Sequence, residues 1–312
     1  MKMFEGKTMD FNYSLTYYKA VNASEEHYGM QYQDGINVDI LPFNDNPNES
    51  CCAGGLYFSD LEHIFEFTGG NVYIYEVTIP INEKVIQDDN KWRVHRFCLS
   101  NRRTIQEFII EVLHNEFNNK GNVNLRSLTT LPSDVKFNNE GTVDLDSLTT
   151  LPSGFEFNNE GYVDLSSLTT LPSGFEFNNK GNVDLRSLTT LPSGFKFNNE
   201  GDVNLGSLTT LPSDVKFNNK GYVDLSSLTT LPSGVQFNNK GSVDLSSLTT
   251  LPSGVQFNNE GDVDLSSLTT LPSGVQFNNG GYVYLRSLTT LPSDVKFNNK
   301  GDVYLKNGFS PK

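Results

Sequence analysis

Hydrophobic residues recur with a fixed period of 20 residues over most of the chain, from residue 117 onward. Each unit starts at a phenylalanine, and nine complete units are followed by a tenth that stops at Lys312. The consensus is F-N-N-x-G-x-V-x-L-x-S-L-T-T-L-P-S-x-V/F-x, where x is variable. A unit this short cannot bury its own apolar face, so the units are expected to stack on one another.

The spacing within one unit predicts two short strands and two corners. Val243 and Leu245 alternate with polar residues, and a second alternating stretch spans residues 255–257. This period of two is typical of strands with one face turned inward. Pro252 has no N–H to donate, so the chain is expected to turn there. The Asn-Asn-x-Gly segment ending at Gly241 predicts the second corner, because Asn and Gly tolerate positive φ.

Six side chains of each unit are predicted to point inward and to pack on their equivalents in the neighbouring coils. In one unit these are Phe237, Val243, Leu245, Leu248, Leu251 and Val255. The array is therefore predicted to be a parallel β-solenoid of 20-residue coils over residues 117–306. The paired asparagines of every unit leave two interpretations open: they form amide ladders between coils, or they serve a turn.

The motif Leu248-x-x-Leu251-Pro252, together with the strand Val243-x-Leu245, resembles short leucine-rich repeats. It is also similar to 20-residue L-x-x-L-P arrays of bacterial, phage and giant-virus proteins. Leu248 stands where the leucine-rich pattern has asparagine. A leucine-rich-repeat-like horseshoe is therefore the second choice, behind a straight solenoid with two faces.

The units differ mainly at positions that alternate with the buried strand residues and so face outward. One position carries tyrosine in every third unit, and another carries aspartate in most units. These residues form the candidate binding face: Tyr162, Tyr222, Tyr282, Asp144, Asp164, Asp184, Asp224, Asp244 and Asp264. Stacked carboxylates favour a cation or a basic partner. One carboxylate per coil falls short of the oxygen ligands that calcium takes, so no metal site is predicted. Such positions also vary simply because nothing restrains them.

Residues 1–103 contain no repeat and are predicted to form a small α+β head domain. Strands are expected over residues 15–21, 36–41, 55–58, 72–79 and 94–99, and a short helix over residues 60–67. A second helix, over residues 104–116, is predicted to cap the array. It starts with the capping-box pair Thr104 and Glu107 and continues with an apolar stripe. Residues 307–312 are expected to form a tail.

The head carries the segments Tyr18-Lys19, Gly29-Met30-Gln31-Tyr32, Gly35-x-Asn37, Cys52-Ala53-Gly54-Gly55-Leu56-Tyr57-Phe58 and Glu76-Val77-Thr78-Ile79-Pro80. Through these it resembles the N-terminal domains of uncharacterised proteins of mimivirus-like giant viruses, which precede ankyrin or other repeats. The resemblance implies the company of repeats and no particular activity.

The order of strand, glycine-rich loop, Gly-Gly-Leu-Tyr-Phe strand, helix and strand also looks like ADP-ribosyltransferases. The resemblance implies that Tyr57 would stack on a nicotinamide ring. Tyr18-Lys19-Ala20 stands where those enzymes have His-Gly or Arg, and no catalytic glutamate can be placed. The candidate head pocket consists of Tyr18, Lys19, Gly54, Gly55 and Tyr57, with no catalytic residue nominated. The alternative is that Tyr57 only packs in a core.

Charge and cysteine content narrow the function classes. The net charge is −14, and residues 1–116 hold 9 basic against 18 acidic residues. Without a basic stripe, nucleic acid is not an expected partner. The three cysteines form no disulfide framework, and the four histidines are scattered, so no metal or cofactor is expected. No apolar run is long enough to span a membrane, and the first 18 residues show no signal-peptide core.

The sequence thus predicts a non-catalytic repeat protein with an elongated binding or scaffolding surface for an unknown protein partner. The resemblances imply a viral setting, and we expect a monomer in the cytoplasm of the host cell or in the virion. The alternative is an ADP-ribosyltransferase-like, NAD-binding head displayed on a solenoid.

Overall fold

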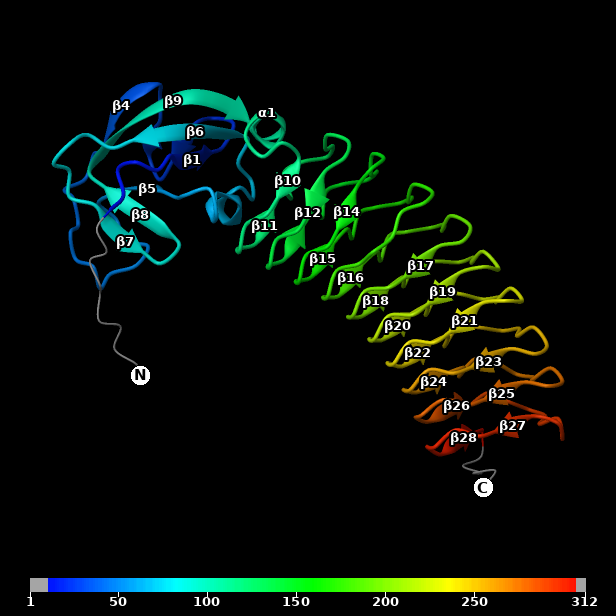
Figure 1. Ribbon diagram of the computed structural model, residues 1–312. Helices are drawn as coiled ribbons and strands as arrows, with labels where there is room; N and C mark the ends of the chain where they lie inside the picture. The colour runs from blue at the N-terminus through cyan, green and yellow to red at the C-terminus, as the bar shows by residue number, and fades with distance from the viewer. Residues whose placement is uncertain (1–10, 307–312) are drawn as a thin grey trace. The chain divides into compact units, whose positions relative to one another are not determined.

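The computed structural model describes residues 11–306 (Figure 1). The chain divides into two compact units, Met1–Ser127 and Leu128–Lys312. The first is the α+β head together with the opening residues of the array, and the second is a stack of β coils. The predicted fold class, a small α+β region followed by a parallel β-solenoid, is confirmed. The predicted tail over residues 307–312 lies outside the described part of the chain.

Two antiparallel sheets form the head. The larger sheet has the order β1-β6-β9-β4, with β1 (Tyr17–Val21), β6 (Tyr73–Thr78), β9 (Arg96–Thr104) and β4 (Gly35–Val38). The smaller sheet has the order β5-β8-β7, with β5 (Leu56–Phe58), β8 (Lys91–Val94) and β7 (Ile86–Asp88). A separate hairpin joins β2 (Glu26–His27) to β3 (Met30–Gln31). Apolar side chains of both sheets, among them Tyr17, Phe58 and Phe97, share one core.

All five predicted head strands are present with shifted ends, whereas β2, β3 and β7 were not predicted. The expected strand over residues 94–99 is really the end of β8 followed by the longer β9. The predicted helix over residues 60–67 is wrong in type, because only η1 (Ile64–Phe67) forms, as a single 3₁₀ turn. Runs this short are typical of 3₁₀ geometry.

The second predicted helix is shorter than expected. Helix α1 runs over Ile105–Glu111 and begins with the predicted capping box. The Glu107 backbone N–H donates to the Thr104 hydroxyl at 3.2 Å, and the Thr104 N–H donates to the Glu107 carboxylate at 2.8 Å. The first phenylalanine of the array, Phe117, packs against Phe65 of η1 with ring centroids 4.9 Å apart. Phe65 in turn contacts Phe108 of α1, so η1 and α1 together line the start of the array.

The array contains two rows of short parallel strands, one strand of each row in most coils (Figure 1). The head unit contributes β10 (Glu116–Phe117) and β11 (Val123–Asn124). The first row continues with β13 (Val143–Asp144), β15 (Val163–Asp164), β16 (Val183–Asp184), β18 (Val203–Asn204), β20 (Val223–Asp224), β22 (Val243–Asp244), β24 (Val263–Asp264), β26 (Val283–Leu285) and β28 (Val303–Leu305). The second row comprises β12 (Lys136–Phe137), β14 (Glu156–Phe157), β17 (Lys196–Phe197), β19 (Lys216–Phe217), β21 (Gln236–Phe237), β23 (Gln256–Phe257), β25 (Gln276–Phe277) and β27 (Lys296–Phe297).

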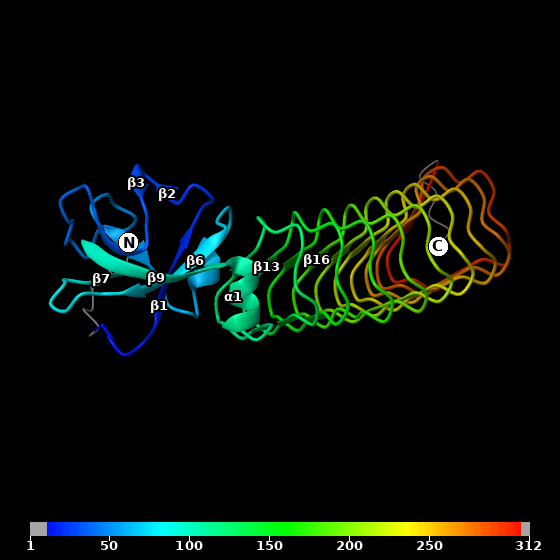
Figure 2. The same ribbon diagram turned by 90° about the horizontal axis from the view of Figure 1, so that it is seen from above.

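Neighbouring strands pair in register, so equivalent residues of successive coils lie side by side. Val223 pairs with Val243, and Val243 pairs with Val263. Figure 2 shows the coils one behind another, and Figure 1 shows that the stack bends gently along its length. The six side chains predicted to be inward in the unit starting at residue 237 are all buried. The phenylalanine rings stack almost parallel: Phe217 and Phe237 lie 5.4 Å apart with an interplanar angle of 4°.

Both interpretations of the paired asparagines are correct, each for one member of the pair. The first asparagine is exposed and forms the ladder: the Asn278 amide donates to the Asn258 side-chain oxygen at 3.1 Å. The second is buried and serves the corner, because the Asn239 amide donates to the Gly241 carbonyl at 2.9 Å and to the Gly221 carbonyl, one coil back, at 3.2 Å.

The corner at Gly241 is present, but the predicted reason for its glycine is wrong. Gly241 is not among the residues with positive φ. A Cβ there would lie 2.3 Å from the carbonyl carbon of Gly221, so glycine is needed because the backbones of adjacent coils approach closely. Positive φ occurs instead after Leu-Pro-Ser, as at Gly254, where φ is 75°.

Candidate functional site

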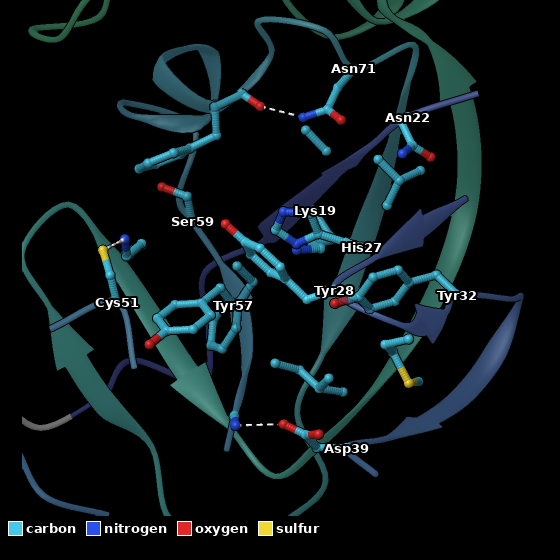
Figure 3. Close-up of a pocket in the computed structure, with 18 of the residues that line it drawn as sticks. Lys19, Asn22, His27, Tyr28, Tyr32, Asp39, Cys51, Tyr57, Ser59 and Asn71 are labelled. Carbon is cyan, nitrogen blue, oxygen red and sulfur yellow. Dashed lines mark hydrogen bonds between the residues drawn. The ribbon is translucent and has the colours of Figure 1, made fainter. Parts of the chain in front are cut away.

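The head contains a cavity of about 780 Å³ beside β1 and β5 (Figure 3). All five residues of the candidate head pocket line it: Tyr18, Lys19, Gly54, Gly55 and Tyr57. The sequence thus nominated residues that the fold brings together from β1 and from the glycine-rich loop. Most of the other lining residues were not predicted, among them His27, Tyr28, Tyr32, Asp39, Cys51 and Lys91.

A buried arginine holds the glycine-rich wall of the cavity in place. Arg93 of β8 is fully buried, and its guanidinium donates to the backbone carbonyls of Glu49 and Asn46. Its Nη1 also lies 2.7 Å from the Cys52 sulfur. Residue 54 passes close to the backbone of Pro42, and only glycine fits there. Its φ is 85°, and a Cβ would lie 2.3 Å from the Pro42 carbonyl oxygen.

Tyr57 lines the cavity, but its hydroxyl is already engaged. The hydroxyl donates to the Cys52 carbonyl at 3.0 Å, and burial is the main cause that raises the pKa of Tyr57 to about 12. The Lys91 ammonium lies 5.0 Å from the centre of the Tyr57 ring. A ligand can therefore meet Tyr57 only through its ring, beside a cation.

Lys19 comes from the buried strand β1, and its ammonium lies 4.9 Å from the centre of the Tyr32 ring. Burial, assisted by the positive charge of Lys91, lowers the pKa of Lys19 to about 8. Asp39 is the only carboxylate among the described lining residues, and it accepts the backbone N–H groups of Gly55 at 2.5 Å and Leu41 at 2.9 Å. The cavity is therefore cationic in character.

The mouth of the cavity carries an exposed thiol. The Lys91 ammonium donates to the Cys51 sulfur at 2.9 Å, and this hydrogen bond is the main cause that lowers the pKa of the Cys51 thiol. Its sequence neighbour Cys52 lies beside Arg93 instead. The sequence did not indicate that the two cysteines differ, because their partners, Lys91 and Arg93, come from the distant strand β8.

On the solenoid, the predicted tyrosine and aspartate rows form one surface. The Tyr162 hydroxyl donates to the Asp184 carboxylate and the Tyr222 hydroxyl to Asp244, each at 3.1 Å. Burial, with the nearby carboxylates, raises the pKa of both tyrosines. Tyr162 and Tyr222 wall a shallow hollow of about 220 Å³, which also includes Asp184, Asp202, Asn204 and Asp224.

The aspartates of the row also have a local structural role. Each carboxylate accepts the backbone N–H of the residue two positions on, as Asp224 does from Ser226 at 2.9 Å and Asp264 from Ser266 at 2.9 Å. Asp144, Asp164 and Asp244 make the same turn contact. Asp184 is the buried member, and its ion pair with Arg186 helps to keep its pKa below the usual range. The row is therefore partly neutralised at this coil.

The third predicted tyrosine lies in a different environment. Tyr282 contacts the Tyr304 ring at 5.7 Å, and Tyr284 stacks on Tyr304 at 5.2 Å with an angle of 11°. Tyr284 and Tyr304 occupy the position that is aspartate in most other coils. The face thus changes from acidic, near Tyr162 and Tyr222, to aromatic at its C-terminal coils.

Residues 11–306 contain no group of three His, Cys, Asp or Glu side chains placed to hold a metal ion. No helix in this part of the chain is long and apolar enough to cross a membrane.

Comparison with known proteins finds relatives in Acanthamoeba polyphaga mimivirus. The putative ankyrin repeat protein R868 is 34% identical over 99 residues, which cover 30% of this chain and 49% of the relative. The uncharacterized protein R869 is 36% identical over 66 residues, or 21% of this chain and 48% of the relative. The putative ankyrin repeat protein R229 is 29% identical over 91 residues, or 26% of this chain and 29% of the relative.

The chain thus spans about half the length, or less, of these relatives. No family model matches it, and no solved structure matches it. The predicted resemblance to repeat proteins and uncharacterised proteins of mimivirus-like giant viruses is confirmed. The array of this chain nevertheless consists of 20-residue β coils, as its own sequence and fold show.

Proposed function

We propose that the chain is a non-catalytic repeat protein whose solenoid offers an elongated binding or scaffolding surface to another protein. The observation that carries this proposal is the hollow between Tyr162 and Tyr222 on a sheet of strands in register. The mimivirus relatives support a viral setting, and the free thiols support a reducing compartment such as the cytoplasm of an infected cell.

The array suits such a role because it is ordered before any partner arrives. Its inward phenylalanine, valine and leucine columns are buried, and the inner asparagines tie each corner to the preceding coil. A rigid surface loses little conformational entropy on binding, so more of the contact energy remains as affinity.

The chemistry of the hollow favours a basic side chain on the partner. Two tyrosines line the hollow together with the carboxylates of Asp202 and Asp224, while Arg186 offsets the charge of Asp184. Tyrosine supplies rigid amphipathic contact area, and it is enriched where interfaces gain most of their affinity. Acidic groups in the same hollow as the tyrosines would select lysine or arginine and steer its approach.

Affinity capture from cells that produce the tagged full chain tests this proposal. The double variant Tyr162→Ser/Tyr222→Ser removes both walls of the hollow. The matched control Gln236→Ala/Gln256→Ala changes two exposed residues of the other strand row. We expect a protein that the wild type and the control capture equally and that the tyrosine variant loses. Equal capture by all three proteins would contradict the proposed face.

The second candidate function is an NAD-dependent transferase in the head. It is supported by the meeting of Tyr18, Lys19 and Tyr57 in one cavity. The hydrogen bonds of Asp39 count against this function. Asp39 is the only carboxylate among the described residues that line the cavity, and it already accepts two backbone N–H groups. Incubating the full chain with labelled NAD separates the two: label transfer that disappears in Tyr57→Ala would establish the transferase and overturn the non-catalytic proposal.

A further inference from the structure

Lys19 occupies a position where the strand pattern calls for an apolar residue. Every residue of β1 is buried, and Lys19 lies on the same face of the strand as Tyr17 and Val21, which both belong to the head core. Only 7% of Lys19 is exposed. Burying an ammonium is unfavourable unless an opposite charge or hydrogen-bond acceptors compensate for it. Local departures of this kind concentrate at functional sites.

The Lys19 ammonium has no such compensation within residues 11–306. It forms no hydrogen bond or ion pair there, and its nearest favourable contact is the Tyr32 ring. The other ionisable residues that line the same cavity are Lys91, His27, Asp39, Cys51, Cys52 and the tyrosines Tyr18, Tyr28, Tyr32 and Tyr57. Asp39 is held by backbone amides, and the Lys91 charge acts against protonation of Lys19. Among the described residues, the cavity therefore contains a buried cation without a counter-ion.

A tyrosine at the mouth of the same cavity is equally out of place. Tyr28 and Gly29 form the turn between β2 and β3, with φ of 50° and 78°. Such turns favour asparagine or glycine, because side chains on Cβ strain the left-handed conformation. Tyr28 is also 94% exposed, yet it lines the cavity, and Figure 3 shows its ring among the other lining side chains. A strained, exposed aromatic ring beside a cavity is suited to cover a bound molecule.

From these observations we propose that the head cavity binds a small organic anion that carries a planar ring. Its acidic group would supply the missing counter-ion of Lys19, and Lys91 would favour the same charge. Its ring would lie beside Tyr57 and beneath Tyr28. A cavity of about 780 Å³ has the size of sites that enclose such ligands. This proposal is independent of the solenoid face and requires no reaction.

Two fluorescent probes of matched shape test the charge requirement on the full chain. 8-Anilinonaphthalene-1-sulfonate is anionic, whereas N-phenyl-1-naphthylamine has the same rings without the sulfonate. We expect the wild type to bind the anionic probe more tightly. Lys19→Met keeps the unbranched shape of the side chain, one atom shorter, and should weaken binding of the anionic probe by at least about tenfold, as expected for a lost charge-assisted contact. It should leave the neutral probe unchanged.

The control Lys84→Met removes an exposed lysine that pairs with Asp45 and does not line the cavity. It should alter neither probe. If Lys19→Met leaves the anionic probe unchanged, or weakens both probes equally, the proposal is overturned.

Folding of the variants is followed through Trp92, the single tryptophan of the chain, which packs against the head core. Lys19→Met should raise the melting temperature reported by Trp92, because it replaces an uncompensated buried cation with an apolar side chain. A lower melting temperature would show that Lys19 already has a compensating partner, and would overturn the proposal.

The pH dependence of the anionic probe gives an independent readout. The pKa of Lys19 is about 8, so Lys19 loses its charge between about pH 7 and about pH 10. The affinity for the anionic probe should therefore fall over this range, whereas the affinity for the neutral probe should stay constant. Constant affinity for both probes over this range would contradict an anion held by Lys19.

Tyr28→Asn tests the cover. Asparagine suits the turn, so the head should be at least as stable as the wild type, whereas both probes should bind more weakly because the stacking ring is lost. Unchanged affinity for both probes would refute the role of Tyr28.

Discussion

At the residue scale, the two asparagines of each coil show how neighbours in sequence can have different physical roles. Asn218 is exposed and donates to Asn198 at 3.4 Å. Asn219 is fully buried and donates to the carbonyls of Gly201 at 3.2 Å and Gly221 at 3.1 Å. A buried hydrogen bond is costly to lose because no water replaces it. We therefore attribute the stability of the corner to the second asparagine.

Replacing each asparagine in turn tests this assignment. Asn219→Ala should lower the free energy of unfolding of the array by about 1–3 kcal/mol, since buried carbonyls lose their donor. Asn218→Ala, the matched control, should cost less than about 1 kcal/mol because water reaches that side chain. Urea unfolding followed by far-ultraviolet circular dichroism measures both. Equal losses would show that the ladder and the corner contribute alike.

The Cys51 thiol provides a second residue-scale prediction. The hydrogen bond from Lys91 lowers the pKa of Cys51, so more of this thiol is ionised near neutral pH than in an isolated cysteine. Iodoacetamide should therefore modify Cys51 faster than Cys98, which is only partly exposed. Lys91→Met should slow the reaction of Cys51 several-fold and leave Cys98 unchanged, as measured by peptide mass spectrometry. A rate for Cys51 that does not respond to Lys91→Met would rule out this activation.

At the element scale, periodicity predicted strands better than it predicted the causes of turns. Alternation placed the array strands correctly, because the side chains that alternate with polar residues are also those that pack inward. It could not place the hairpins β2–β3 and β7–β8, whose strands are only two to four residues long. Asp89 has positive φ in the turn between β7 and β8, and an aspartate there could have indicated a hairpin. Tyr28 has positive φ in the turn between β2 and β3, where it gave no such indication because tyrosine is uncommon in these turns.

The candidate site was predictable where its residues belong to one of two short segments. Gly54, Gly55 and Tyr57 form one segment, and Lys19 stands out as a charge within an apolar strand. Lys91 and Asp39 gave no sequence signal, because they reach the cavity through the pairing of strands and the path of a loop. That Lys19 has no counter-ion within residues 11–306 likewise depends on the hydrogen bonds that hold Asp39, which only the fold determines.

The fifth residue of each coil is a glycine that, from residue 161 onward, contacts the backbone of the preceding coil. Gly241→Ala would place a methyl group against the backbone of the preceding coil, so the array should lose about 1–3 kcal/mol or more. Gly206→Ala is the control, because a Cβ at that position meets side-chain atoms and no backbone, and comes no closer to them than 3.3 Å. It should be nearly neutral in urea unfolding. A neutral Gly241→Ala would mean that adjacent coils are farther apart than the structure has them.

At the scale of the whole molecule, the two compact units offer different kinds of site. The head encloses a small cationic cavity, whereas the solenoid presents an open face of tyrosine and aspartate. The invariant positions of the array are occupied by packing and corner contacts, so they leave the outward positions for recognition. The central claim is therefore that a protein partner meets the face around Tyr162 and Tyr222.

Site-specific photo-crosslinking tests that claim most directly. A benzophenone amino acid replaces Tyr222 in one protein and Gln236, in the other strand row, in a second. On irradiation in cells that produce the full chain, we predict a discrete cross-linked protein from position 222 and none from position 236. Cross-links from neither position, or the same product from both, would contradict a binding face formed by the tyrosine and aspartate rows.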